Sequence, residues 1–176
     1  MLRRLTALDG STVLSLADAK AQCRVLHSDE DALIGALRDA AVTHVERESA
    51  VILVPSQFEW QGACFPTDLP VQPVTALGTV TYTAEDGTDT PYTGARLLNN
   101  QILPVFGEEW PDVDGRVLIQ FTAGVTDLTT VPDLVAAVRL LTAHWYQNRE
   151  AATAQPHSDL PMGVRALLHS YLKVGH

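Results

Sequence analysis

The stretch VPDLVAAVRLLTAHWYQNRE, residues 131–150, decides the fold of this chain. Pro132 followed by Asp133 predicts the start of a helix. Amide hydrogens in the first helical turn have no partner within the helix, so proline, which has no amide hydrogen, loses nothing there. An acidic side chain is also favoured in this turn. Apolar side chains then recur along one face at helical spacing, at Leu134, Val138, Leu141 and Trp145. Further apolar residues continue round the helix, so we expect it to be covered on more than one side.

A second apolar segment, LPMGVRALLHSYL at residues 160–172, predicts a short helix after a linker at residues 151–161. Two interpretations of this helix stay open. It either closes a bundle with the longer helix, or extends from the body and lays apolar anchors in a groove of a partner. No catalytic signature lies between the two helices, which favours a role in assembly.

The N-terminal part of the chain also predicts helices. Ser15 with Asp18 and Ser28 with Asp31 both resemble the pairs of side chains that cap helix starts. The acidic run at residues 29–31 lies at the positive end of the second helix, where it is favoured without any metal ion. One apolar face is expected along that helix, made by Leu33, Ile34, Leu37, Ala41 and Val45.

The middle of the chain changes from helical to β periodicity. The run EDGT at residues 85–88, between two β-like segments, predicts a hairpin turn. Alternating or β-branched runs predict strands at residues 57–63, 74–82 and 116–122. The sequence therefore indicates antiparallel strands in this zone.

Together these zones predict an α+β fold. Helices from residues 1–50 and 126–176 are expected to pack as one bundle, with residues 51–125 inserted as a small antiparallel β unit. The chain has 176 residues, of which 46% are hydrophobic and 19% charged. It is therefore long enough to bury a core, as one domain or as one domain with an insertion.

The net charge of the chain is −9, and residues 51–125 hold most of it, with 2 basic against 9 acidic side chains. Tight sequence-independent binding of nucleic acid needs clustered Lys and Arg, which this sequence lacks. A nucleic-acid-binding regulator is therefore disfavoured. An acidic surface still suits the wall of a DNA conduit, because repulsion keeps DNA from adhering to it.

Cys23 and Cys64 are far apart in the sequence and fit no metal-ligand spacing, so we expect free thiols in a reducing compartment. The start of the chain does not resemble a signal peptide, because polar residues interrupt its apolar character at once. No run approaches the roughly 18 apolar residues of a membrane span. We therefore expect a soluble protein made in a cytoplasm.

Few residues in the sequence point to chemistry, and none of the common nucleophile, phosphate-loop, dinucleotide or zinc-protease motifs occurs. His44 and Glu48 lie one helical turn apart, but a solvated pair is favoured over a cation site. His144 has no nucleophile or carboxylate at a recognisable spacing. The acidic loop around Trp110 lacks the ligand order of a calcium-binding hand. We therefore predict no enzyme activity, no cofactor and no metal.

Three stretches of the chain also carry a family resemblance. They are LSLADAKAQCRVLHSDEDALIGALRDAAVTHVE at residues 14–46, VPDLVAAVRLLTAHWYQNREA at residues 131–151 and LPMGVRALLHSY at residues 160–171. Together they resemble the head–tail connector proteins of tailed phages, also called adaptor or head completion proteins. The related proteins of phage-derived gene transfer particles are similar. The resemblance covers nearly the whole chain and rests on the order of its apolar, acidic and aromatic patterns.

This resemblance implies a structural virion protein. Such a connector would form a dodecameric ring on the portal protein, extend the DNA channel and provide the platform for tail attachment. Its partners would be the portal, a tail-side connector or stopper protein, and further copies of itself, while DNA passes without specific binding and no membrane is involved. Whether the chain is monomeric before assembly stays open. The implied location is the head–tail junction of a virion or phage-like particle, after synthesis in the cytoplasm of a bacterial host.

The resemblance also suggests which residues make these contacts. In the family the C-terminal helix or tail docks on the portal, which assigns the portal contact here to Leu167, Leu168, Tyr171 and Leu172. Aromatic and arginine side chains concentrate binding energy at interfaces, so subunit contacts are predicted at Trp145, Tyr146 and Arg149. These three side chains equally fit the core and the end of the bundle. The alternative function is a small virion-associated hydrolase that uses His144 or the acidic loop around Trp110.

Overall fold

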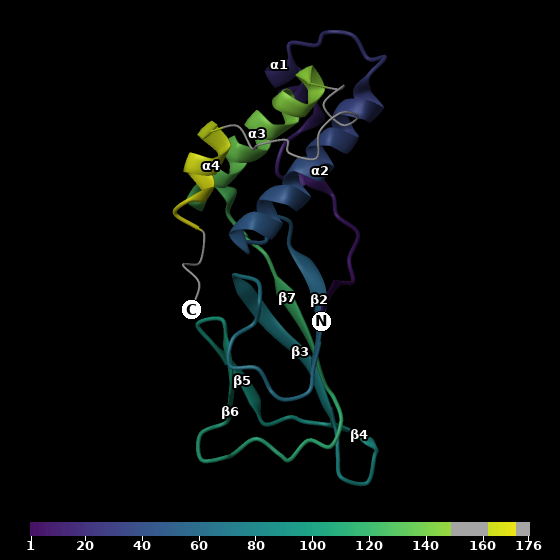
Figure 1. The fold of residues 1–176 in the computed structure, drawn as a ribbon, viewed down its shortest axis with the longest axis vertical. Helices are drawn as coiled ribbons and strands as arrows, with labels where there is room; N and C mark the ends of the chain where they lie inside the picture. Colours follow the sequence, from purple (N-terminus) through teal and green to yellow (C-terminus); the bar gives the residue numbers. More distant parts are fainter. Residues whose placement is uncertain (149–161, 172–176) are drawn as a thin grey trace. The chain divides into compact units, whose positions relative to one another are not determined.

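The computed structural model describes residues 1–148 and 162–171 (Figure 1). The predicted α+β class, with helices from both ends of the chain and an antiparallel β unit between them, is confirmed. The chain divides into two compact units. The β unit comprises Met1–Ala7 and Pro55–Val125, and the helical unit comprises Leu8–Val54 and Thr126–His176. The first seven residues, which the sequence had grouped with the helices, therefore belong to the β unit.

The helical unit is built around its longest apolar helix. Its elements are η1 (Gly10–Thr12), α1 (Leu16–Cys23), α2 (Asp31–Ser49), η2 (Leu128–Thr130), α3 (Pro132–Gln147) and α4 (Met162–Leu168). Helix α3 begins at Pro132 as predicted and packs against α1, α2 and α4. Leu134, Val138 and Leu141 are fully buried, whereas Trp145 at the end of the same face is half-buried. The expectation that α3 is covered on more than one side is therefore confirmed. None of the helices in the described ranges is long and apolar enough to cross a membrane.

The first predicted helix cap is confirmed. The Ser15 hydroxyl oxygen accepts a hydrogen bond from the Asp18 amide at 3.1 Å, and the hydroxyl donates to the Asp18 carboxylate at 2.7 Å. This reciprocal arrangement satisfies an amide that the first turn of α1 leaves unpaired.

The second predicted cap, Ser28 with Asp31, is wrong. Helix α2 begins at Asp31 with Glu30 in the cap position and without a side-chain cap. The acidic side chains instead have partners from elsewhere in the fold. Lys20 of α1 pairs with the Asp31 carboxylate at 2.6 Å, and the Tyr146 hydroxyl donates to the Glu30 carboxylate. Tertiary contacts thus replace the local cap.

The buried face of α2 also differs from its predicted apolar face. Ile34, Ala41 and Val45 are fully buried as expected, but Leu33 is exposed. Charged and polar side chains lie on the buried face instead, namely Arg38, Glu46 and Ser49. Each of these polar side chains has a hydrogen-bond partner, which offsets the cost of burying it.

Glu46 shows how such a polar side chain shapes the chain. Its Oε1 atom accepts hydrogen bonds from the amides of Leu53 at 2.8 Å and Val54 at 3.0 Å, just after the end of α2. Ala50 closes the helix in the left-handed conformation, with a φ of 57°. The Glu46 carboxylate therefore holds the segment that follows α2 against α2 itself.

The β unit consists of a five-stranded antiparallel sheet in the order β1-β2-β7-β3-β4 and a separate β5–β6 hairpin. Its strands are β1 (Leu2–Arg4), β2 (Ser56–Gly62), β3 (Val74–Thr83), β4 (Asp89–Pro91), β5 (Ala95–Leu98), β6 (Gln101–Pro104) and β7 (Val117–Ala123). The three predicted strand regions correspond to β2, β3 and β7. The predicted hairpin turn is also confirmed, with Gly87 at a φ of 78° between β3 and β4.

Two parts of the β unit were not predicted. Strand β1 pairs with β2, with Leu2 opposite Trp60 and Arg4 opposite Phe58. The β5–β6 hairpin turns through Asn99 and Asn100, whose φ angles of 48° and 71° are both positive. Two successive positive φ angles are typical of tight hairpin turns, and asparagine tolerates them. The Asn-Asn pair was the sequence signal for this hairpin.

The core of the sheet lies on one face of its central strands. Strand β7 alternates, so that Val117, Ile119, Phe121 and Ala123 are buried. The Phe121 ring stacks on Phe58 of β2, with centroids 5.7 Å apart and planes 19° apart. Side chains at the intervening positions lie on the opposite face, as the period of two in a strand requires.

Candidate assembly interfaces

The predicted portal-contact residues fall partly inside the helical unit. In α4, Leu168 is only 2% exposed and Val164 is fully buried. Leu167 and Tyr171 are half-buried, while Leu172 lies outside the described residues. Leu168 therefore helps to close the bundle, and Leu167 and Tyr171 are the predicted side chains with surface left for a partner.

The predicted subunit-contact residues lie at the end of α3. The Trp145 ring meets His44 of α2 edge-on, with ring centroids 5.9 Å apart and planes 83° apart. Tyr146 is half-buried and donates its hydroxyl to Glu30. Arg149 lies outside the described residues. The two aromatic side chains thus join α3 to α2 and still expose part of their surface.

This packing also affects the imidazole of His44. Burial lowers the pKa of its imidazole below the ordinary value of 6.5, against the opposing effect of the Glu48 carboxylate. The Nη2 atom of Arg47 lies 3.2 Å from the Nδ1 atom of His44, and the charge of Arg47 also lowers the pKa of His44. Within the described residues, no three or more His, Cys, Asp or Glu side chains are grouped to hold a metal ion.

The lowered pKa of His44 predicts a pH-dependent stability. The unfolded chain binds a proton near pH 6.5, whereas the folded helical unit binds it only at lower pH. Below about 6.5 the unfolded state holds more protons, so its free energy falls relative to the folded state. We expect the thermal midpoint to drop more on acidification in the wild type than in His44→Gln, as followed by circular dichroism at 222 nm. Equal drops in the two proteins would contradict this assignment.

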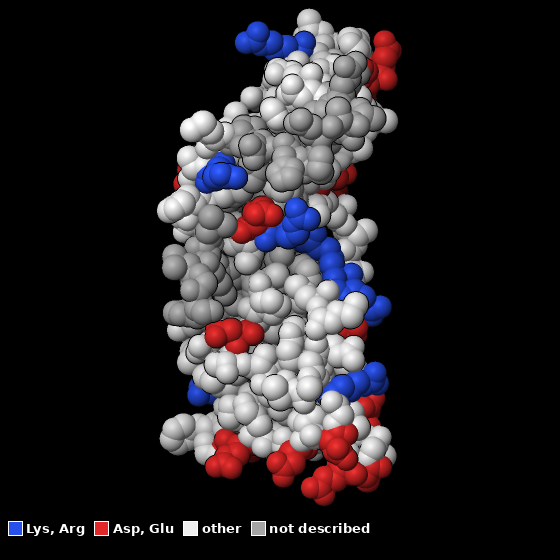
Figure 2. Space-filling view, viewed as in Figure 1, with Lys and Arg blue, Asp and Glu red and all other residues white. Residues whose placement is uncertain are grey.

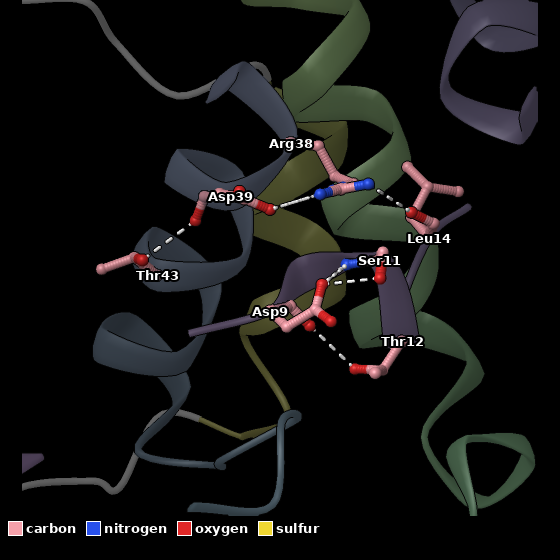
Figure 3. Close-up of polar contacts among 7 residues, drawn as sticks. All are labelled: Asp9, Ser11, Thr12, Leu14, Arg38, Asp39 and Thr43. Carbon is pink, nitrogen blue, oxygen red and sulfur yellow. Dashed lines mark hydrogen bonds and ion pairs between the residues drawn. The ribbon is translucent and has the colours of Figure 1, made fainter. Parts of the chain in front are cut away.

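A buried arginine fixes the segment before α1 onto α2 (Figure 3). Arg38 is 7% exposed; its Nε donates to the Asp39 carboxylate at 2.9 Å, and its Nη1 donates to the Leu14 carbonyl oxygen at 3.4 Å. Gly10 lies directly against this pair, because a Cβ atom there would clash with the Asp39 carboxylate. The cluster is a structural tie within the helical unit.

Asp9 lies close enough to this tie to be influenced by the charge of Arg38. Its carboxylate accepts hydrogen bonds from the Ser11 amide at 3.0 Å and the Ser11 hydroxyl at 2.6 Å, starting the short η1 helix. These bonds lower the pKa of the Asp9 carboxyl, and the charge of Arg38 adds to the effect. The sequence did not point to this cluster, because its members are separated by nearly thirty positions.

A row of bonded polar side chains crosses the exposed face of the sheet. The Arg3 guanidinium of β1 donates to the Glu59 carboxylate of β2 at 2.9 Å. The Gln120 amide of β7 donates to the other oxygen of Glu59 at 3.4 Å, and the Thr79 hydroxyl of β3 donates to the Gln120 side-chain oxygen at 2.9 Å. We call these four residues the polar row. It runs from one edge strand, through the centre of the sheet, to β3.

Trp110 has a packing role in the β unit. Its ring stacks on Phe65, with centroids 4.2 Å apart and planes 8° apart, and Tyr82 and Tyr92 complete an aromatic cluster around them. Burial raises the pKa of the Tyr92 hydroxyl, and the nearby Glu108 carboxylate adds to this rise. The sequence placed these aromatics in separate segments and did not predict the cluster.

Acidic side chains gather at one end of the β unit, around the turn that leads into β4 (Figure 2). The β3–β4 turn supplies Glu85 and Asp86. The chain before β7 supplies Asp112 and Asp114, and the Asp114 amide donates to the Thr83 carbonyl oxygen at 3.0 Å. The negative charge predicted for the middle of the sequence is thus concentrated on loops at this end.

Among the solved structures that resemble this chain over its whole length are three chains of gene transfer agent particles. One is a chain from the neck of an empty gene transfer agent particle, computed with C6 symmetry, with a TM-score of 0.80 and 28% identity. Another is from the virion of a native gene transfer agent particle, with a TM-score of 0.79 and 29% identity. The third is from the neck of a native particle, computed with C12 symmetry, with a TM-score of 0.77 and 28% identity. Each match covers 100% of this chain and 97% of the other.

No protein-family model and no curated protein sequence matches this chain. The structural matches confirm the predicted resemblance to the connector family that includes proteins of gene transfer agents. Their origin in necks and a virion likewise confirms the predicted location, the head–tail junction of a virion or phage-like particle.

Proposed function

We propose that this protein is a head–tail connector. It forms a ring on the portal, extends the DNA channel and provides the platform for tail attachment. The observation that carries this proposal is the full-length match to chains of gene transfer agent necks. Those neighbours are structural components of particles, which favours an assembly role over a hydrolase built on His144 or the loop around Trp110.

The physical demands on such a ring fit the molecule. A closed ring of identical subunits needs two different complementary surfaces on each copy, related by one rotation. The C6 and C12 symmetries of the neighbours' necks are symmetries of that kind. Trp145 and Tyr146 belong to one proposed subunit contact, because they are large, amphipathic and only half-buried within their own unit.

The charge of the β unit suits a DNA channel. With 2 basic and 9 acidic side chains between residues 51 and 125, a surface of this unit would repel the phosphate backbone. DNA could then pass without being held by counterion release, which needs clustered basic residues. We propose that the acidic loops at the β4 end contribute to this non-adhesive surface.

The portal contact is proposed for the C-terminal segment that includes α4. Leu167 and Tyr171 are half-buried and face a partner with the remainder of their surface, whereas Leu168 is largely occupied by the bundle. A chain cut before α4 would lose the fully buried Val164 as well. Side-chain variants therefore test the contact more cleanly than truncation does.

The test is a pull-down on the portal protein of the same particle. Combining Leu167→Asp with Tyr171→Ala is expected to weaken portal binding by at least about tenfold, the equivalent of roughly 1.4 kcal/mol of lost apolar contact. Ala166→Asp adds the same charge at a neighbouring exposed position of α4 and serves as the control. Undiminished binding by the double variant, with its helical circular dichroism intact, would refute the anchor. Wild-type protein that binds no portal would refute the connector function itself.

A further inference from the structure

In the part of the chain that the structure describes, one edge of the sheet of the β unit includes a stretch of β3 to which no strand is hydrogen-bonded, although β5 packs beside β3. Strand β3 pairs with β7 along its length, but β4 pairs with it only from Thr81 to Thr83. Within the described residues, the stretch from Thr75 to Thr79 therefore has a strand on one side and none on the other. At the opposite edge of the sheet, β1 pairs with β2 on one side, and no other described strand pairs with it.

The free stretch of β3 lacks two of the usual protections of an exposed strand edge, charged residues and proline. Its sequence, TALGT, contains no charged residue and no proline, although monomeric proteins commonly place such residues on open edges. All of its residues except Leu77 are exposed. A cavity of about 370 Å³ lies alongside it, bounded on the far side by Pro91, Tyr92 and Ala95. Register shifts on both sides of Ala76 and Leu77 limit this edge to a short partner strand, and β1 has three residues.

Strand direction allows the two edges to meet between copies. The strands β1, β2, β7 and β3 alternate in direction, because each neighbouring pair is antiparallel. Strands β1 and β3, which form the two edges, therefore run in opposite directions. A rotation that forms a ring keeps the direction of every strand relative to the axis, so β1 of one copy arrives antiparallel to β3 of the next. This is the heterologous arrangement that ring closure requires.

The polar row supplies the register of this pairing. Arg3 lies opposite Glu59, Glu59 lies opposite Gln120, and Gln120 bonds to Thr79. The row thus ends at Arg3 on one edge and at Thr79 on the other. If the row continues between copies, the exposed Arg3 side chain comes beside Thr79 of the next subunit.

We propose that β1 of one copy adds to the free edge of β3 in the next copy, as an antiparallel strand with Arg3 beside Thr79. The sheets of successive subunits then join into one continuous sheet round the ring. Main-chain hydrogen bonds supply the affinity, as in other cases of strand addition. This inference rests on the proposed function, because it assumes that copies of the chain are arranged in a ring.

Disulfide cross-linking in purified particles tests this contact. The variant carries Arg3→Cys and Thr79→Cys in a Cys64→Ser background, because Cys64 is an exposed free thiol. Within one chain the two new cysteines are separated by three strand spacings, roughly 14 Å. A disulfide needs Cα atoms within about 7 Å of each other, so only a bond between copies can form. Mild oxidation is expected to produce a ladder of linked multimers on a denaturing gel.

Matched controls separate this contact from random collision. Each single-cysteine variant, and the pair Arg3→Cys with Thr88→Cys on the exposed β3–β4 turn, should give no ladder. Hydrogen exchange on wild-type particles gives a second readout, in which amides 75–79 should exchange more slowly than in the unassembled chain. Particles that contain the chain but show neither ladder nor protection would overturn the strand pairing. Particles that lack the chain would instead overturn the proposed function.

Discussion

Replacing Glu46 with alanine is expected to lower the free energy of unfolding of the helical unit by about 2–6 kcal/mol. Its carboxylate accepts the amide hydrogens of Leu53 and Val54, and all three residues are at least 95% buried. Each buried amide that loses its acceptor costs about 1–3 kcal/mol. Because these residues are buried, solvent compensates the lost acceptor poorly.

Urea unfolding followed at 222 nm measures this loss. Glu46→Gln retains one side-chain oxygen that can accept a hydrogen bond, so it should lose less stability than Glu46→Ala. Glu48→Ala is the matched control, because its ion pair with Arg47 is solvent-accessible and such pairs are worth about 0–1 kcal/mol. If Glu46→Ala behaves like Glu48→Ala, the carboxylate does not hold the chain after α2.

The second large effect is expected in the β unit. Phe121→Ala should lower its stability by about 3–5 kcal/mol, the usual cost of removing a buried aromatic ring from a core. Phe121 is 2% exposed and stacks on Phe58, which is 3% exposed. The remaining Phe58 ring would face an empty space, and the flanking strands β2 and β3 cannot close it without breaking their register with β7.

Hydrogen exchange read by mass spectrometry locates this loss. Amides of β2 and β7 should exchange faster in Phe121→Ala, while those of α3 should change less, because Phe121 and α3 belong to different compact units. Gln61→Ala changes an exposed side chain on the adjacent strand β2, outside the polar row, and is expected to stay within about 0.5 kcal/mol of the wild type. Equal acceleration in β7 and α3 would show that the two units unfold together.

Elements with strong local signals were predictable. The start of α3 follows from Pro132 and Asp133, and that of α1 from Ser15 and Asp18, because each signal acts within a single helical turn. The strand regions around β2, β3 and β7 follow from β-branched and alternating residues. These signals depend on neighbours only a few positions away, so one sequence contains them.

Elements that depend on distant partners were missed or misplaced. Strand β1 has only three residues and forms because β2, more than fifty positions later, offers an edge. The cap predicted at Ser28 was overruled by Lys20 and Tyr146, which lie in other helices. The sequence placed Leu167 and Leu168 together as candidate anchors, but burial separates Leu168 from Leu167, and periodicity alone does not.

The sequence by itself thus determined the α+β class, the long apolar helix α3, the acidic middle of the chain and the resemblance to phage connectors. Only the tertiary structure decided which polar groups are buried, how the strands are ordered and which edge of the sheet is open. The physical reason is the sequence distance between the residues that determine each feature. Helical turns, hairpins and charge are set by adjacent residues, whereas the polar row and the partners of Glu46 and Arg38 exist only once distant segments meet.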